Sequence, residues 1–371
     1  MRIFPKQPSD GDLPPPRLIT LPGAICVFLG LFGCLAIFNA TFHLDTPFLF
    51  LTRQLVWLTV GTAVLIIATA IPSRMHKTLL PVYVLLAYIP LILVLFYGVR
   101  INSMRGWFAI RTIFYQPSET AKPIFVLVLA WVLGRTQAHR REFVKGFLPA
   151  LAVLVLWAIP IILQPDFGSL LVYGLTFCVL VLCAGTRVRH LSACAPVLVI
   201  FLIWVLITHP YVAQRMAGFF NPEKYPDSYG WHIIQFHRSL ASGGLFGKSW
   251  GEGVWSQTHL PLGYSDSIFA TLGEAIGFIG LCPFVGLIVV WTVYGYRRTQ
   301  GLADAFAAMS ILGLTACLSI QAFIHLSVNL ALLPPTGITL PLVSYGGSSL
   351  LSAAITVGLV ESFARGKKRF Q

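Results

Sequence analysis

The stretch LLPVYVLLAYIPLILVLFY (residues 79–97) contains no charged residue and is almost entirely apolar. The hydrocarbon core of a bilayer accommodates roughly 20 apolar residues as a helix, so this stretch predicts a transmembrane segment. Similar segments recur along the whole chain, and the predicted spans are about 22–42, 50–72, 78–98, 119–136, 147–164, 168–186, 191–209, 267–296, 303–330 and 346–364. The sequence therefore predicts an all-α integral membrane protein, a bundle of about ten transmembrane helices.

Composition and charge placement support a membrane protein. Of the 371 residues, 56% are hydrophobic and 11% are charged, whereas a soluble domain averages about 25% charged residues. The net charge of +13 is compatible with nucleic-acid binding, but most Lys and Arg residues fall in short loops and tails on one side of the predicted spans. By the positive-inside rule, this places both termini in the cytoplasm. We therefore expect no nucleic-acid partner.

The predicted organisation has three parts. Residues 1–21 are expected to form a cytoplasmic tail, 22–364 the ten-span membrane domain and 365–371 a basic cytoplasmic tail. A large outer loop, 210–266, lies between spans 7 and 8. Loops of this length are usually functional or disordered, and its Gly, aromatic and polar residues favour an ordered active surface.

A second, re-entrant-like loop is predicted between spans 9 and 10, in LLPPTGITLPLVSYGGSS (332–349). Its prolines and glycines interrupt the hydrophobic pattern. Broken backbone at membrane depth persists only where it is buried in protein or lines a wet cavity. The loop is therefore expected either to pack against the bundle or to form the wall of a groove for a polar headgroup, and both can hold together.

A single acid, Asp266, stands immediately before the eighth span in LGYSDSIFAT (262–271). No Lys or Arg lies between Lys248 and Arg297 to neutralise it. Ionisable groups at membrane depth are energetically expensive, so they usually pair or perform chemistry. We expect a structural pairing role for Glu274, about two turns further along, and a catalytic role for Asp266.

The segment NSMRGWFAIRTIFYQPSETAKP (102–123) contains further candidates. Arg105 beside Trp107 suits a sugar or pyrophosphate, although Trp107 can also be an interfacial anchor. Ser118 is placed to cap a helix N-terminus. Glu119 and Lys122 are three residues apart on one helical face, so the alternative to substrate binding is that they pair with each other.

Two other blocks combine turn residues with polar groups. In LQPDFGS (163–169), Asp166 can act in function or simply cap the sixth span. In the outer loop, ASGGLFGKSWGEG (241–253) has glycines for close backbone approach to a ligand. It lacks the strand-to-helix context of a nucleotide loop, so as a phosphate-binding signature it is weak.

Together these blocks closely resemble the SEDS family (shape, elongation, division and sporulation), to which RodA and FtsW belong. The matching positions are Trp107, 116–119, Lys122, the turn 164–168, LPLGYSDSIFATLGEAIG (260–277) and LPPTGITLPLVSYGGSS (333–349). Asp266 stands at the place of the family's catalytic acid. The departures are Leu262 where an acid is common, Ser267 for Phe, Ala275 for a second Glu, and Gly106 for an Arg that here is one position early, as Arg105.

The resemblance implies a peptidoglycan glycosyltransferase that polymerises lipid II onto a nascent glycan strand at the outer face of the bacterial cytoplasmic membrane. It also implies a class B penicillin-binding protein, a transpeptidase, as partner. Asp266 is then the general base. The substrate-binding candidates are Arg105, Trp107, Glu119, Lys122, Asp166, Arg215, Arg238, Lys248 and Ser344.

The diphosphate leaving group requires cationic stabilisation, for which the basic members of this set are candidates. A divalent cation, Mg²⁺ or Mn²⁺, is compatible with a diphosphate, but no ligand cluster in the sequence demands one. Two alternatives remain at this level: a lipid II flippase of the same fold, and a non-catalytic scaffold for cell-wall synthases. A flippase predicts polar residues along the spans, whereas the acids here gather near the outer face.

Overall fold

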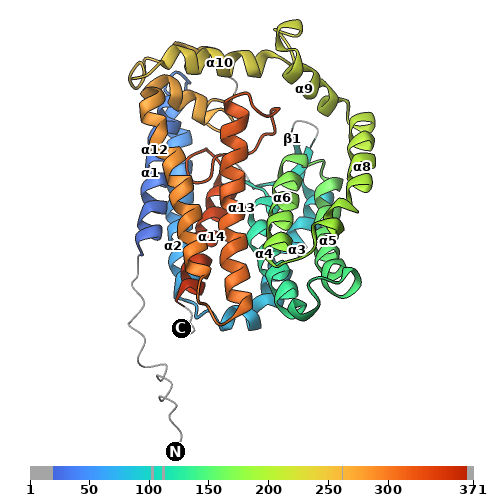
Figure 1. The fold of residues 1–371 in the computed structure, drawn as a ribbon. Helices are drawn as coiled ribbons and strands as arrows, with labels where there is room; N and C mark the ends of the chain where they lie inside the picture. The colour runs from blue at the N-terminus through green and yellow to red at the C-terminus, as the bar shows by residue number, and fades with distance from the viewer. Residues whose placement is uncertain (1–19, 102–103, 111–112, 261, 366–371) are drawn as a thin grey trace, which may run out of the picture.

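The structure, a computed structural model, describes residues 20–101, 104–110, 113–260 and 262–365. Long helices stand side by side, and the chain enters α1 and leaves α14 at the same end of the bundle (Figure 1). The long helices are α1 (Leu21–Thr41), α2 (Pro47–Ala70), α3 (Met75–Tyr97), α4 (Pro117–Arg135), α5 (Leu148–Leu163), α6 (Phe167–Cys183), α8 (Ala195–Thr208), α12 (Ile268–Thr299), α13 (Ala305–Asn329) and α14 (Gly347–Ala364).

Shorter elements connect them. These are β1 (Val99–Ile101), β2 (Met104–Ile110), β3 (Ile113–Tyr115), η2 (Gln137–His139), η3 (Phe143–Phe147), α7 (Val188–Ser192), α9 (Pro210–Phe220), η4 (Pro222–Lys224), α10 (Trp231–Gly243) and α11 (Val254–Thr258). Every one of the predicted apolar segments corresponds to a helix, so the prediction of an all-α membrane protein is confirmed.

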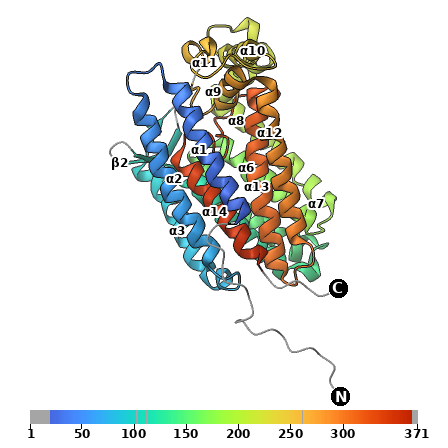
Figure 2. The same cartoon turned by 90° about the vertical axis from the view of Figure 1, so that its left-hand side faces the viewer.

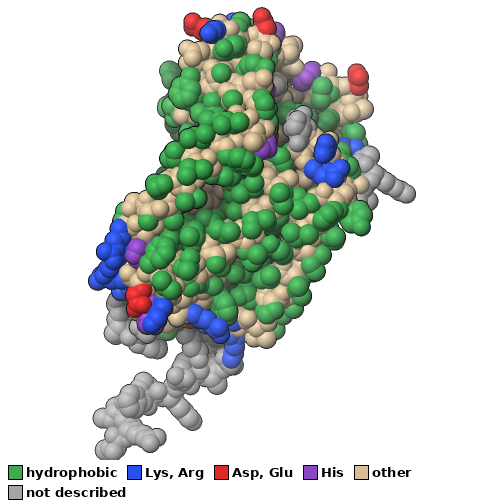
Figure 3. Space-filling view, turned by 90° about the vertical axis from the view of Figure 1, so that its right-hand side faces the viewer, with side chains coloured by type: hydrophobic (Ala, Val, Ile, Leu, Met, Phe, Trp, Pro, Cys, Tyr) green, Lys and Arg blue, Asp and Glu red, His purple; other side chains and the backbone are tan. Residues whose placement is uncertain are grey.

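Eight helical segments among the described residues are long and apolar enough to cross a membrane. They are α1, α2, α3, Phe143–Leu163, Val188–Thr208, α12, α13 and α14. The other two predicted spans are helices of a different kind, since α6 has 17 residues and α4 carries Glu119 and Lys122 in its interior. Figure 3 shows a broad apolar surface with charged side chains towards its two ends, as expected for a chain that meets lipid along its sides.

The core is centred on α4, α13 and α14. α13 packs against α4, α6, α12 and α14, while α14 lies along α2. Large side chains such as Phe125, Trp157 and Tyr173 are almost completely buried where α4, α5 and α6 meet. α8 differs from the others: it stands at the edge of the bundle (Figure 1), and its main packing partner is α9.

The outer loop forms an ordered layer across the end of the bundle opposite the two termini. α9, α10 and α11 lie over this end (Figures 1 and 2), and α10 packs on α12. α10 is amphipathic, because Ile233, Phe236 and Ser239 are buried against the bundle while His237 and Arg238 are exposed. Residues 210–260 and 262–266 therefore form helices and turns, as an ordered layer requires, and an active role for this surface stays a prediction.

The segment before α4 forms a small antiparallel sheet in the order β1-β2-β3, which the sequence analysis did not anticipate. Val99 pairs with Trp107, and Phe108 pairs with Tyr115. The three strands have 3, 7 and 3 residues, too few for a period-2 alternation to stand out from a loop.

α12 is broken at Gly277, whose φ of 69° and ψ of −178° are not helical. The groups released by the break pair with the glycine-rich stretch 241–253: Phe278 donates its N–H to Gly244, and Lys248 donates to Glu274. A Cβ on Gly247 would lie 2.3 Å from the carbonyl oxygen of Ala275. The glycines therefore serve close approach between two backbones, which differs from the ligand-binding role considered from the sequence.

Candidate active site

Asp266 lies on the loop that leads into α12 and is half-buried. Ser265 donates its hydroxyl to Oδ1 of Asp266 at 2.8 Å, and the side chain of Asn329 donates to the main-chain oxygen of Asp266 at 3.0 Å. No hydrogen bond reaches Oδ2 from any described residue. A Cβ on Gly337 would lie 3.8 Å from Oδ2, so a glycine leaves space beside the oxygen that has no partner.

The re-entrant-like loop, here residues 330–346, holds Asp266 in place. Its second half is buried in the bundle, with Ile338, Leu340 and Val343 in the core, whereas Leu330 and Leu332 in its first half are exposed. The hydroxyl of Ser344 donates to the carbonyl of Ser265 at 2.7 Å and accepts from the N–H of Leu340 at 2.8 Å. The N–H of Tyr345 donates to the carbonyl of Tyr264 at 2.9 Å. The two loops are therefore joined at two successive residues, Tyr264 and Ser265.

Asn329, at the end of α13, is a positioning residue that the sequence analysis missed. It is fully buried, and its Oδ1 accepts the N–H of Ala270 in the first turn of α12 at 3.1 Å. Its Nδ2 holds the main chain of Asp266. One side chain therefore fixes the main chain of Asp266, two residues before α12, and the first turn of that helix. A lone Asn at the end of an apolar span was the available signal.

Burial raises the pKa of Asp266, while the hydroxyl of Ser265 and the positive charge of Arg215 lower it. Arg215, on α9, donates to the carbonyl of Pro335 at 3.3 Å and lies over the ring of Tyr211 at 5.7 Å. The guanidinium is thus held beside the 330–346 loop without forming an ion pair with Asp266. The result is a carboxylate with a raised proton affinity next to a fixed cation.

Glu119 and Lys122 lie in a buried polar network instead. Lys122 is 2% exposed, and its Nζ lies 2.5 Å from Oε1 of Glu119 and 3.0 Å from Oε1 of Gln321. Gln321 extends the network to Ser349 and to the carbonyl of Thr339. Glu119 and Lys122 therefore pair with each other, as one of the two alternatives predicted, and their role in substrate binding stays a prediction.

Asp166 is also buried and fully occupied. Its Oδ1 accepts the N–H of Ser169, which makes it the N-cap of α6. Its Oδ2 accepts from the hydroxyl of Ser118 at 2.7 Å and from the amide of Gln116 at 3.1 Å. Asp166 thus has the capping role that was one of its two alternatives. Ser118 does not cap α4 as predicted, because its hydroxyl is directed to Asp166.

The remaining candidates lie on other elements. Arg105, on β2, donates to the carbonyl of Leu95 near the end of α3 at 3.1 Å, and Trp107 is half-buried on the same strand. Arg238 lies over the ring of Trp255 at 5.2 Å, and Lys248 is exposed in the glycine-rich stretch. Within the described ranges, hydrogen bonds join Ser344 to the Asp266 loop but join none of these four residues to it.

Glu274 has the structural role expected of it. It is fully buried, and its carboxylate accepts the N–H groups of Trp255 and Ser256, at the start of α11, and the hydroxyl of Ser242. A carboxylate at a helix start satisfies N–H groups that have no partner within the helix. Glu274 therefore attaches the outer layer to α12.

In the part of the chain that the structure describes, no three His, Cys, Asp or Glu residues converge as metal ligands do. Mg²⁺ is often held by one or two carboxylates together with the phosphates of a substrate, so Asp266 alone fits a cation shared with a diphosphate and does not form a closed protein site. The nearby cation that the protein supplies is the guanidinium of Arg215, whose charge acts on Asp266.

Comparison with known proteins gives a consistent result. The family described as "Cell cycle protein", which covers FtsW, RodA and SpoVE, matches residues 17–369. A probable peptidoglycan glycosyltransferase FtsW from Idiomarina loihiensis is 32% identical over 318 residues, 85% of this chain and 78% of the relative. Stage V sporulation protein E of Bacillus subtilis is 31% identical over 328 residues, covering 88% of this chain and 90% of the relative.

Two solved structures resemble the whole bundle. The rod shape determining protein RodA of Thermus thermophilus has a TM-score of 0.66 at 27% identity, over 92% of this chain and 95% of that chain. A chain of a peptidoglycan synthase complex has a TM-score of 0.74 at 27% identity, over 92% and 97%. With the family match across nearly the full length, the chain belongs to the FtsW/RodA/SpoVE family of cell cycle proteins, the SEDS family.

Proposed function

We propose that this protein is a peptidoglycan glycosyltransferase that polymerises lipid II, with Asp266 as the general base. The observation that carries the proposal is the state of the Asp266 carboxylate: it is half-buried, its pKa is raised by that burial, and Oδ2 has no protein partner among the described residues. The names of the relatives support the reaction class.

The chemistry follows from these groups. The carboxylate of Asp266 accepts the proton of the acceptor sugar's 4-hydroxyl as that oxygen attacks the anomeric carbon of the donor. The new glycosidic bond forms as the bond from the anomeric carbon to the diphosphate oxygen breaks, with inversion, and undecaprenyl diphosphate leaves. A base is most effective when its pKa lies near the working pH, and burial moves Asp266 in that direction.

Arg215 is the cation best placed to stabilise the leaving diphosphate. Its guanidinium is already fixed on the 330–346 loop, so it need not reorganise as negative charge develops. Arg238 and Lys248 belong to the outer layer and are proposed as headgroup contacts at its surface. Arg105 and Trp107 keep the proposed role of binding sugar or diphosphate, presented by the β-sheet beside α3.

The site's position relative to the membrane suits a lipid-linked donor. The candidate span α12 begins two residues after Asp266, at Ile268, so a sugar at the carboxylate can remain attached to a polyprenyl chain in the bilayer. We propose that this face is the outer side of the bacterial cytoplasmic membrane and that both termini are cytoplasmic. The synthase complex among the solved relatives supports a class B penicillin-binding protein as partner.

The test is polymerisation of labelled lipid II by the purified protein with a candidate transpeptidase partner. Wild type is expected to make glycan chains, and Asp266→Asn is expected to be slower by about 10²–10⁴-fold while keeping its melting temperature. Asp227→Asn is the matched control, because Asp227 is an exposed acid of the same outer layer.

Each contrary outcome identifies a different error. Equal rates for wild type and Asp266→Asn would make Asp266 structural and remove the proposed mechanism. If wild type moves lipid II across vesicles without polymerising it, a flippase replaces the glycosyltransferase. If it does neither while still binding the transpeptidase, it is a scaffold.

A further inference from the structure

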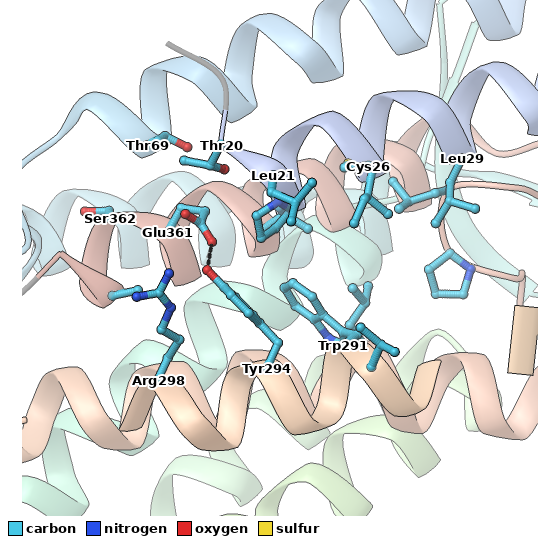
Figure 4. A pocket seen from close by; sticks show the side chains of 18 of the residues that line it. Thr20, Leu21, Cys26, Leu29, Thr69, Trp291, Tyr294, Arg298, Glu361 and Ser362 are labelled. Carbon is cyan, nitrogen blue, oxygen red and sulfur yellow. Dashed lines mark hydrogen bonds between the residues drawn. The ribbon is translucent and has the colours of Figure 1, made fainter. Parts of the chain in front are cut away.

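A large cavity lies between α1, α12 and α14 and extends towards the end of the bundle where α1 begins. Its volume is about 1270 Å³, above the range of roughly 300–1,000 Å³ that holds ordinary small ligands. Leu21, Cys26 and Leu29 of α1 point across it towards Trp291 and Tyr294 of α12 (Figure 4). The proposed reaction at Asp266 makes no use of this space.

The cavity is polar at one end and apolar along the rest. Arg298, Glu361 and Ser362 lie at the polar end (Figure 4). The hydroxyl of Tyr294 donates to the carboxylate of Glu361, and the guanidinium of Arg298 lies over the ring of Tyr294 at 5.1 Å. The apolar remainder is formed by residues that include Leu29, Phe284, Leu287, Ile288, Trp291 and Leu342.

Charge at the polar end favours an anionic ligand. Three arginines line the cavity there, and they are Arg74, Arg298 and Arg365. Among the described residues, Glu361 is the one acid that lines it, and its carboxylate accepts a hydrogen bond from Tyr294. Arg365 donates to the carbonyl of Thr69, so Arg298 is the arginine to which we assign the ligand. Basic pockets between transmembrane helices characteristically bind the headgroups of anionic lipids.

The length of the cavity matches one leaflet. It follows α12 from Phe284 to Arg298, which at 1.5 Å per residue is about 21 Å. Half of the bilayer's hydrocarbon core is about 15 Å, so the cavity can hold a headgroup together with the chains of a lipid from a single leaflet. Its inner end is formed by residues 340–343 of the re-entrant-like loop.

We propose that this cavity is a binding site for one anionic phospholipid, with the phosphate headgroup at Arg298 and the acyl chains between α1 and α12. The site goes beyond the proposed glycosyltransferase function and does not depend on it, because the lipid is a resident ligand rather than a substrate. The chains contact residues 340–343 of the re-entrant-like loop.

The experiment is native mass spectrometry of the full-length protein after exchange into detergent with added phosphatidylglycerol, phosphatidylcholine or undecaprenyl phosphate. Wild type is expected to retain one phosphatidylglycerol. Leu29→Trp, which fills the cavity, is expected to lose it, whereas Phe28→Trp is expected to retain it because Phe28 does not line the cavity and is 64% exposed. The same retention is expected in Asp266→Asn, which separates this result from any failure of the polymerisation assay.

A pair of arginines tests the headgroup. Arg298→Gln is expected to reduce the preference for phosphatidylglycerol over phosphatidylcholine about fivefold. Arg297→Gln removes the same charge one residue away but does not line this cavity, so it should leave the preference unchanged. Equal retention by Leu29→Trp and Phe28→Trp would overturn the site. Preferential retention of phosphatidylcholine or of undecaprenyl phosphate would overturn its assignment to an anionic phospholipid.

Discussion

Glu119 and Asp266 are both carboxylates at the start of a membrane helix, and their surroundings differ sharply. Glu119 is 7% exposed and has Lys122 and Gln321 as partners for its two oxygens. Asp266 is half-buried, with one hydroxyl on one oxygen and no described partner on the other. A carboxylate surrounded by donors stabilises the bundle, whereas one left with an open oxygen retains the capacity to accept a proton.

The largest effect on the free energy of unfolding should come from breaking the buried ion pair between Glu119 and Lys122. Lys122→Met leaves the charge of Glu119 uncompensated in the core, and the free energy of unfolding is expected to fall by about 3–5 kcal/mol. Thermal unfolding in detergent measures this. The double variant Glu119→Gln/Lys122→Met should recover much of the loss, because it removes both charges.

The exposed ion pair between Lys77 and Asp304 is the matched control. Their side chains are 44% and 49% exposed, so Lys77→Met should lower the free energy of unfolding by no more than about 1 kcal/mol. Similar melting temperatures for Lys77→Met and Lys122→Met would show that the ion pair with Lys122 does not stabilise the bundle. The contrast between the paired carboxylate of Glu119 and the open carboxylate of Asp266 would then be lost.

An intermediate effect is expected where the two loops are joined. Ser344→Ala leaves the carbonyl of Ser265 and the N–H of Leu340 without their partner, at a cost of about 1–3 kcal/mol for each group that stays buried. The kcat for polymerisation should fall more than KM changes if the main effect of the substitution is on the position of Asp266, because Ser344 is hydrogen-bonded to the loop that carries Asp266. Ser192→Ala, at an exposed hydroxyl, is the control. An unchanged kcat in Ser344→Ala would show that the join does not position the base.

The smallest effect concerns the pH dependence of the reaction. Burial raises the pKa of Asp266, so the active, ionised form is lost as pH falls through that raised value, and kcat/KM should decline on the acid side. The charge of Arg215 lowers the pKa of Asp266. Arg215→Gln should therefore move this acid limb to higher pH. A limb that stays in place or moves to lower pH would separate Arg215 from the base.

The sequence predicted the helical bundle well because each span is a long apolar run, and such runs are set by the bilayer rather than by distant contacts. Packing of the re-entrant-like loop against the bundle was one of the two alternatives that the sequence left open. The strands β1, β2 and β3 were not predicted, because runs of 3, 7 and 3 residues are too short for a period-2 alternation to stand out from a loop. The break at Gly277 was not predicted because it depends on pairing with the distant glycine-rich stretch 241–253.

For the candidate site, the sequence does not distinguish the surroundings of its carboxylates. Glu119, Asp166 and Asp266 each stand in a block that resembles the family, and what differs is the number of donors that reach each carboxylate in three dimensions. Asn329 stood at the end of an apolar span and carried no motif. Its role depends on the end of α13 lying beside the start of α12, which only the three-dimensional structure shows.

The break at Gly277 has a mechanical consequence. Above it, the first turns of α12 are held by Asn329 and by the outer layer through Glu274; below it, the longer part of the helix borders the lipid-facing cavity. If α12 were continuous, any change in the tilt of the part after Gly277 would also move the part next to Asp266. Because the helical hydrogen bonds are interrupted at Gly277 and the freed backbone groups pair with the glycine-rich stretch 241–253, we expect such a change in tilt to be taken up at this joint and to leave Asp266 in place.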